Sequence, residues 1–472
     1  MFCMLLIMVM TRSQFYSFSH SNQPFIPNST QMVIQASKRL NFQILCPAIA
    51  IIGEKSMQRN VTTQGLDGHN NSVNSRRYDI DAIRVLAFAI LILYHSAMFY
   101  VQDWGWHVKS QYQAEWLQIP MMFFNQWRMA LLFVISGMAT FFLVKKYGSG
   151  FVGNRLKIVG IPLLFGMFVI VSPQAFFEAR FETDYNESFW IFWQHYVGLS
   201  DWPAMMSNGS DYDLTWNHLW YLPYMLLYSI VIIPFSIASA RLSKHLASQS
   251  IPLLFWMVVP LLPLMLLGTY LFPLFPYIDH SFFEDGYAHG LYFTFFLLGF
   301  VLMHSKQVWQ QLSSNRWILL GTSIVSFIVF ISMNQNYPEQ PNKLYEQSFL
   351  LVLYSNRWFW ILTLLAMAHT YLNRPAKWLS YGTGAVFTWY ILHQSITVSI
   401  GALITPFSVG AWLEPIVVVG GTALGCLLIH HFIVRPLPFL HLLMGHRDNK
   451  VDRGAKKESS GKMSKQPEVF RV

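Results

Sequence analysis

Apolar blocks of about 20 residues, the length of helix that crosses a lipid bilayer, recur along most of this sequence. We expect each block to form a transmembrane helix: 80–101, 129–147, 157–176, 219–239, 251–273, 287–304, 316–334, 356–373, 383–404 and 412–434. Only 12% of the 472 residues are charged, whereas a soluble domain carries about 25%. The sequence therefore predicts an all-α integral membrane protein with about ten transmembrane helices, and it disfavours a soluble fold.

The charges between the blocks predict an orientation, because cytoplasmic loops are rich in Lys and Arg. With the N-terminus in the cytoplasm, the inner loops carry no acidic residue but hold Lys145, Lys146, Arg155, Lys157, Arg241, Lys244, Lys306, Arg316, Arg374 and Lys377. The outer loops and helix ends hold many acidic residues and only five basic ones. Ten spans with both termini cytoplasmic satisfy this pattern at every loop.

The two ends of the chain differ from the apolar middle. We expect a poorly ordered N-terminal extension over 1–75, of which 1–56 precede a second candidate start at Met57, a membrane domain over 76–440, and a basic cytoplasmic tail over 441–472. The net charge of +9 comes from these ends, which favours tails that lie against an anionic membrane face or are simply solvated, and argues against a nucleic-acid partner. Three scattered cysteines predict no disulfide framework, and no His, Asp or Glu set has metal-ligand spacing.

The first block carries three ionisable residues in an otherwise apolar helix. Arg84 and His95 are eleven residues apart, about 20° past three full turns, so they share one face about 16 Å apart along the axis. Asp81 lies one turn before Arg84. Such residues are costly in lipid and usually face a cavity. The alternative is that Arg84 snorkels to the inner surface and His95 only packs.

Four other residues are weaker candidates for the same cavity. Arg128, at the predicted outer start of the second helix, either binds an acidic substrate or pairs with an outer carboxylate. His218 and Trp220 open the fourth helix at the outer face, where anchoring in the interface is the alternative. His393 lies in the middle of the ninth helix and either joins the cavity or packs.

The segment "YDIDAIRVLAFAILILYH" resembles the first helix of the membrane acyltransferase-3 family, whose signature is a basic residue, ten intervening residues and a histidine. The motifs "WRMALLFVISGM", "NRLKIVGIPLLFG", "NHLWYLPYMLLYS", "WYILHQ" and "VRPL" follow in order. The resemblance covers about 76–440. Within the family, the chain is most similar to the glucans biosynthesis protein C branch, which is associated with succinylation of periplasmic glucans.

The resemblance implies a multi-pass enzyme of the bacterial inner membrane that moves an acyl group from cytoplasmic acyl-CoA to a glycan hydroxyl. The family's histidine corresponds to His95 and its basic residue to Arg84. Histidine titrates near neutrality, so we expect His95 to act as general base, and an acyl-histidine intermediate is not favoured. We expect Arg84 to position the donor and Asp81 to orient Arg84. The co-substrate is acyl-CoA, and no bound cofactor is expected.

Two further basic residues are expected to hold the phosphates of coenzyme A. Arg155 and Lys157 belong to "NRLK", where the family often has a second arginine. Lysine offers a point charge instead of a planar fork, so the phosphate geometry at Lys157 departs from the family pattern.

A polytopic transporter or exporter is the competing reading, with Asp81, Arg84 and His95 as a proton or substrate path. Transporters typically have broken helices in matched halves, a pattern that this sequence does not show. The acyltransferase motifs therefore favour the enzyme.

Overall fold

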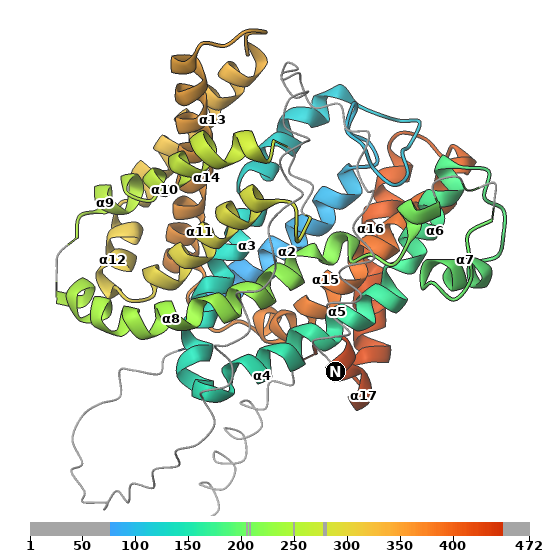
Figure 1. Cartoon of the computed structure of the whole chain (residues 1–472), viewed down its shortest axis with the longest axis horizontal. Helices are drawn as coiled ribbons and strands as arrows, with labels where there is room; N and C mark the ends of the chain where they lie inside the picture. The colour runs from blue at the N-terminus through green and yellow to red at the C-terminus, as the bar shows by residue number, and fades with distance from the viewer. Residues whose placement is uncertain (1–75, 204–205, 207–208, 249–250, 277–280, 447–472) are drawn as a thin grey trace, which may run out of the picture.

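The protein is built from helices that surround a central one, as the computed structural model shows for residues 76–203, 206, 209–248, 251–276 and 281–446 (Figure 1). The first helices are α2 Tyr78–Ala97, α3 Gln118–Tyr147, α4 Phe151–Arg155, α5 Ile161–Phe165, α6 Ser172–Glu182, α7 Phe189–Tyr196, α8 Tyr221–Ser248, α9 Leu253–Val258 and α10 Leu261–Leu266. They are followed by α11 Gly286–Leu302, α12 Lys306–Ser314, α13 Arg316–Gln335, α14 Lys343–Tyr371, α15 Lys377–Ile404, α16 Leu413–Leu428 and α17 Pro438–Leu443. In these ranges the structure has no β-strand, and one isolated bridge joins Val101 to Ala114.

Eight helical stretches of the described chain are long and apolar enough to cross a membrane, and the bent pair α11–α12, whose axes meet at 100°, is a ninth candidate. The prediction of an all-helical integral membrane protein is confirmed. One stretch, Glu115–Glu182, has 68 residues, and a straight helix of that length would reach about 100 Å. It contains the predicted spans 129–147 and 157–176, and the chain turns between them at Gly148, where φ is +51°.

Two helices begin well before the predicted spans. Helix α3 starts at Gln118 instead of 129, and α14 starts at Lys343 instead of 356. Polar side chains such as Arg128 in α3 and Glu346 in α14 interrupt the apolar runs, so hydropathy places the helix start after them. The prediction that Arg128 lies at the start of its helix is therefore wrong: Arg128 lies in the third turn of α3.

Helix α2 occupies the centre and packs against α15, α14, α3 and α16, which bury one side chain after another along its length (Figure 1). Helices α3 and α11 approach each other to backbone contact at two glycines. A Cβ atom on Gly137 would overlap the backbone carbonyl of Phe296, and one on Gly299 would overlap that of Val134. Small residues let membrane helices approach to backbone contact in this way.

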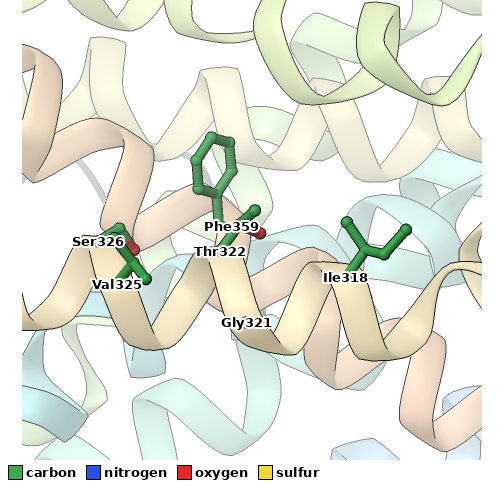
Figure 2. A pocket seen from close by; sticks show the side chains of 6 residues that line it. All are labelled: Ile318, Gly321, Thr322, Val325, Ser326 and Phe359. Atoms are coloured by element: carbon green, nitrogen blue, oxygen red, sulfur yellow. The ribbon is translucent and has the colours of Figure 1, made fainter.

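Helix α13 is the least buried of the candidate spans in the described chain, and its apolar side chains Ile318, Val325 and Ile328 are exposed. A hollow of about 510 Å³ on its surface is lined by Ile318, Gly321, Thr322, Val325, Ser326 and Phe359 (Figure 2). Its lining is almost wholly apolar and includes none of the predicted site residues. This face of α13 is therefore suited to contact with lipid tails.

Two sequence predictions concern the chain ends. The N-terminal extension over 1–75 lies outside the described residues, as does the tail from 447 onwards. Helix α17, Pro438–Leu443, continues across the predicted domain boundary at 440. It lies beside α5 and the helical turn at 429–434.

Candidate active site

The centre of the site is a pair of histidines from helices α2 and α15. His95 lies in the last turn of α2, and its Nδ1 is 2.8 Å from Nε2 of His393. The two rings are parallel to within 9°, with centroids 4.9 Å apart. His393 is almost fully buried. The structure therefore brings His393, one of the weaker sequence candidates, into direct contact with His95.

The protonation of this pair follows from one backbone carbonyl. Nδ1 of His393 lies 2.7 Å from the Tyr390 carbonyl oxygen, which only accepts hydrogen bonds, so this nitrogen carries the proton. In a neutral ring Nε2 then has the lone pair, and it accepts a hydrogen bond from Nδ1–H of His95. As a result, the lone pair of His95 is on Nε2. A histidine held in this tautomer is prepared to accept a proton.

His218 is the third histidine of the cluster. Its ring meets that of His393 edge-on, with centroids 5.3 Å apart. Nε2 of His218 lies 3.1 Å from the Ile391 carbonyl oxygen, to which it donates, and Nδ1 accepts from the Gln174 amide at 3.1 Å. Both nitrogens are thus occupied, so His218 supports the neighbouring ring and has no lone pair left for a substrate proton.

Trp220 does not join the histidines. Its ring contacts those of Phe133 and Tyr292. Trp106, from the loop after α2, covers His95 instead, with ring centroids 5.4 Å apart. Sequence reasoning missed Trp106, although the aromatic run "WGWH" (104–107) shortly after the end of α2 was a usable signal.

Arg128 lies next to the histidine pair as a buried cation. Its guanidinium carbon is 3.4 Å from the centroid of the Tyr94 ring, and Tyr94 precedes His95 in the chain. The residue is 7% exposed, and its charge acts on both His95 and His393. In the part of the chain that the structure describes, Arg128 has no ion pair, and its Nε and Nη1 atoms have no hydrogen-bond acceptor.

The other end of the α2 stripe is basic. Arg84 pairs with Asp81 at 3.2 Å, as the one-turn spacing predicted, and Arg76 approaches the same carboxylate at 2.9 Å. Arg155 is buried on α4 and donates to Thr140 Oγ1 at 2.7 Å. The charges of Arg84 and Arg155 both act on the Tyr221 hydroxyl. These two arginines therefore share one neighbourhood.

Lys157 is separated from Arg155, although the two are close in sequence. It is exposed on the π-helical turn Leu156–Gly160. It lines a different hollow, of about 310 Å³, together with Pro438, His441, Gly445 and His446. The predicted donor-binding pair is thus split between a buried arginine and a surface lysine.

Two tyrosines connect the basic end to the histidines. The Tyr221 hydroxyl is hydrogen-bonded to Ser136, and its ring lies 6.0 Å from that of Tyr390. The Tyr390 ring lies 6.0 Å from that of His393. A column of neighbouring side chains therefore links Tyr221, on which the charges of both arginines act, to the histidine pair.

An acidic and polar group borders the histidines on the side of the loop after α2. Nδ1 of His107 is 2.8 Å from Glu178 Oε2, and its Nε2 is 2.9 Å from the Gln394 amide. Burial alone lowers the pKa of His107, but the Glu178 carboxylate outweighs it, and the pKa is raised above its usual value. Sequence reasoning missed this pair because its members are far apart in the chain.

The histidine cluster is not arranged as a metal centre. Across the described ranges, no group of three or more His, Cys, Asp or Glu side chains is placed to hold a metal ion. His393 and His218 each use one ring nitrogen on a backbone carbonyl, and the other is already hydrogen-bonded. The geometry is that of a proton-accepting histidine with an oriented partner.

The comparisons with known proteins identify a family. A family model described as an acyltransferase domain matches residues 77–431. The chain belongs to the acyltransferase-3 family. The matched range contains every candidate site residue. Arg84 and His95 lie at the two ends of the column.

Glucans biosynthesis protein C is among the similar acyltransferase-3 proteins. The proteins of that name from Salmonella paratyphi B and Salmonella typhi are each 25% identical to this chain over 349 residues. The alignments cover 70% of this chain and 85% of each relative. No solved structure matches the chain.

Proposed function

We propose that this acyltransferase-3 protein is an O-acyltransferase that moves an acyl group from cytoplasmic acyl-CoA to a hydroxyl of a periplasmic or surface glycan. The hydrogen-bond chain from His95 through His393 to the Tyr390 carbonyl carries the proposal, because it leaves the lone pair of His95 on Nε2. A base of this kind is what acyl transfer to a hydroxyl requires.

The reaction follows from that tautomer. Nε2 of His95 takes the proton of the glycan hydroxyl while the hydroxyl oxygen attacks the thioester carbonyl carbon. The tetrahedral species collapses, the carbon–sulfur bond breaks, and the CoA thiolate takes the proton back from His95. The products are the glycan ester and free CoA. His95 ends in its starting state, and no acyl-histidine intermediate is needed.

His393 is a positioning residue in this scheme. It accepts the Nδ1–H of His95 throughout, so it holds the ring in one tautomer and one orientation while Nε2 gains and loses a proton. This resembles the role of the carboxylate in the Ser-His-Asp arrangement, with a neutral acceptor in its place.

The donor end of the proposal rests on Arg84 and Arg155. Guanidinium groups bind phosphates through several charge-assisted hydrogen bonds, and coenzyme A carries phosphates at one end. Arg84 and His95 are about 16 Å apart along α2, a length that the extended pantetheine arm can cover along the Tyr221–Tyr390 column. Exposed Lys157 contributes a more distant charge, and Asp81 orients Arg84.

The proposed membrane placement has ten crossings and both termini in the cytoplasm of a bacterium, in the inner membrane. The basic inner loops support this orientation. It directs Arg84 to the cytoplasmic side, where acyl-CoA is made, and His95 to the side of the glycan. Arg128, His218 and His393 then lie on the acceptor side, and Trp220 contributes packing there.

The acceptor and the acyl group are proposed by likeness to the relatives. Glucans biosynthesis protein C supports a glucan as acceptor, and succinyl follows from the resemblance to that branch. The direct test uses purified protein in lipid nanodiscs with succinyl-CoA and a periplasmic β-glucan. We expect CoA release that depends on the glucan, and a glucan whose mass rises by whole succinyl groups.

The same protein in sealed vesicles tests the transporter reading. Glucan that crosses the membrane without any consumption of acyl-CoA would contradict the acyltransferase proposal and favour a transporter. Glucan that gains acyl groups at the rate at which CoA is released supports the enzyme.

A further inference from the structure

Arg128 is a buried cation that forms no ion pair with an acidic side chain of the described residues. Burying a charge is costly unless the charge is paired, and in membrane proteins such residues mark binding sites. The Tyr94 ring offsets part of the cost through a cation–π contact. Its Nε and Nη1 atoms are nevertheless buried without an acceptor in the described chain.

The carboxylates that border the loop after α2 have other partners. Glu178 is paired with His107 at 2.8 Å, and Asp103 accepts a hydrogen bond from Gln118 at 3.2 Å. Neither forms an ion pair with Arg128, nor does any other acid of the described residues. The arginine is thus available to a ligand anion.

The position of Arg128 relates that anion to the chemistry. Its guanidinium stacks on Tyr94, the residue before His95, and its charge reaches both histidines of the pair. Through Tyr94 it lies at the His95 end of α2, about 16 Å along the helix axis from Arg84. A ligand anion at Arg128 therefore lies next to the acyl carbon that reacts at His95, and away from the phosphates of CoA.

We propose that Arg128 binds an ionised carboxylate at the far end of the transferred acyl group and so determines which donors the enzyme uses. Guanidinium matches a carboxylate in geometry and charge. This inference rests on the acyltransferase function proposed above. The favoured substrates are acyl-CoA molecules with a second carboxylate on the acyl chain.

A pair of donors that differ only at that end tests the proposal. Succinyl-CoA and butyryl-CoA have acyl chains of equal length, one ending in a carboxylate and the other in a methyl group. The measured quantity is the ratio of kcat/KM for the two donors, which does not depend on how much of a sample is folded. We expect the wild type to prefer succinyl-CoA.

Replacing the arginine removes the preference. We expect Arg128→Gln to lower the ratio about 30-fold or more, the effect of losing one member of a buried charge pair. Arg128→Lys keeps a cation without the planar fork, so we expect a smaller fall in the same direction. Arg180→Gln, at an exposed arginine of α6, is the control and leaves the ratio unchanged.

The outcomes separate this inference from the proposed function. A wild type that uses both donors equally would overturn the role of Arg128 but leave the acyltransferase intact. An equal fall of kcat/KM for both donors in folded Arg128→Gln would also overturn that role. If Arg128→Gln fails to fold, an unchanged ratio in Arg128→Lys would do the same. If the wild type releases CoA from neither donor with glucan present, it is the proposed function that fails.

Discussion

Nδ1 of His95 and Nε2 of His393 lie 2.8 Å apart, although 298 positions separate the two residues in the chain. The contact connects His95 to the Tyr390 carbonyl of α15 through the ring of His393. The tautomer of His95 is defined by this contact. The function proposed here depends on that arrangement more than on any other feature of the fold.

Removal of His393 should slow the chemical step and leave donor binding in place. We expect His393→Ala to lower kcat about 10- to 100-fold, as for the outer partners of metal-bound histidines, with little change in KM for acyl-CoA. His393→Gln, whose amide oxygen can accept from His95, should recover part of the loss. A large rise in KM with an unchanged kcat would contradict a positioning role.

The basic end of the column should govern donor affinity. We expect Arg84→Gln and Arg155→Gln each to raise KM for acyl-CoA about tenfold or more, the effect of a lost charge-assisted hydrogen bond. Exposed Lys157→Gln should have a smaller effect. Lys146→Gln, another exposed residue, is the control. Unchanged KM values in both arginine variants would exclude this donor site.

Stability should depend on pH through His107. Its pKa is raised by Glu178, so the pair stabilises the fold fully below the unfolded pKa of about 6.5 and loses this contribution as pH rises through the raised value. We expect His107→Asn to lower the melting temperature in detergent more at pH 6 than at pH 9. His431→Asn, at an exposed histidine, is the control. A pH-independent loss would show that Glu178 does not charge His107.

The contact of α3 with α11 should not tolerate a side chain. Because a Cβ at Gly299 meets the backbone of Val134, we expect Gly299→Ala to destabilise the protein by about 1–3 kcal/mol. Gly321→Ala on α13 meets no atom within 4 Å and is the matched control. It should be neutral or slightly stabilising, since alanine favours helix. Thermal unfolding of both variants in nanodiscs measures the difference.

Helical periodicity and hydropathy were sufficient for the helices and for the Arg84–His95 stripe, since both depend on local spacing. Periodicity and hydropathy could not locate Arg128 inside α3, because a charged residue lowers the local hydropathy in the same way as the end of a membrane helix does. Neither the His95–His393 contact nor the His107–Glu178 pair has a local signal: each joins distant segments through tertiary packing. Trp220 and Lys157 were predicted to act together with His218 and Arg155, their neighbours in the sequence. In the structure Trp220 packs against Phe133 and Tyr292, and Lys157 is exposed.

The central claim is that His95 takes the proton of the acceptor hydroxyl. The most direct measurement is the glucan-dependent release of CoA from succinyl-CoA by purified His95→Ala, with exposed His431→Ala as the matched control. We predict that His95→Ala loses about 10²- to 10⁴-fold in kcat, the contribution of a general base, while His431→Ala keeps wild-type activity. Transfer at the wild-type rate by folded His95→Ala would contradict the account.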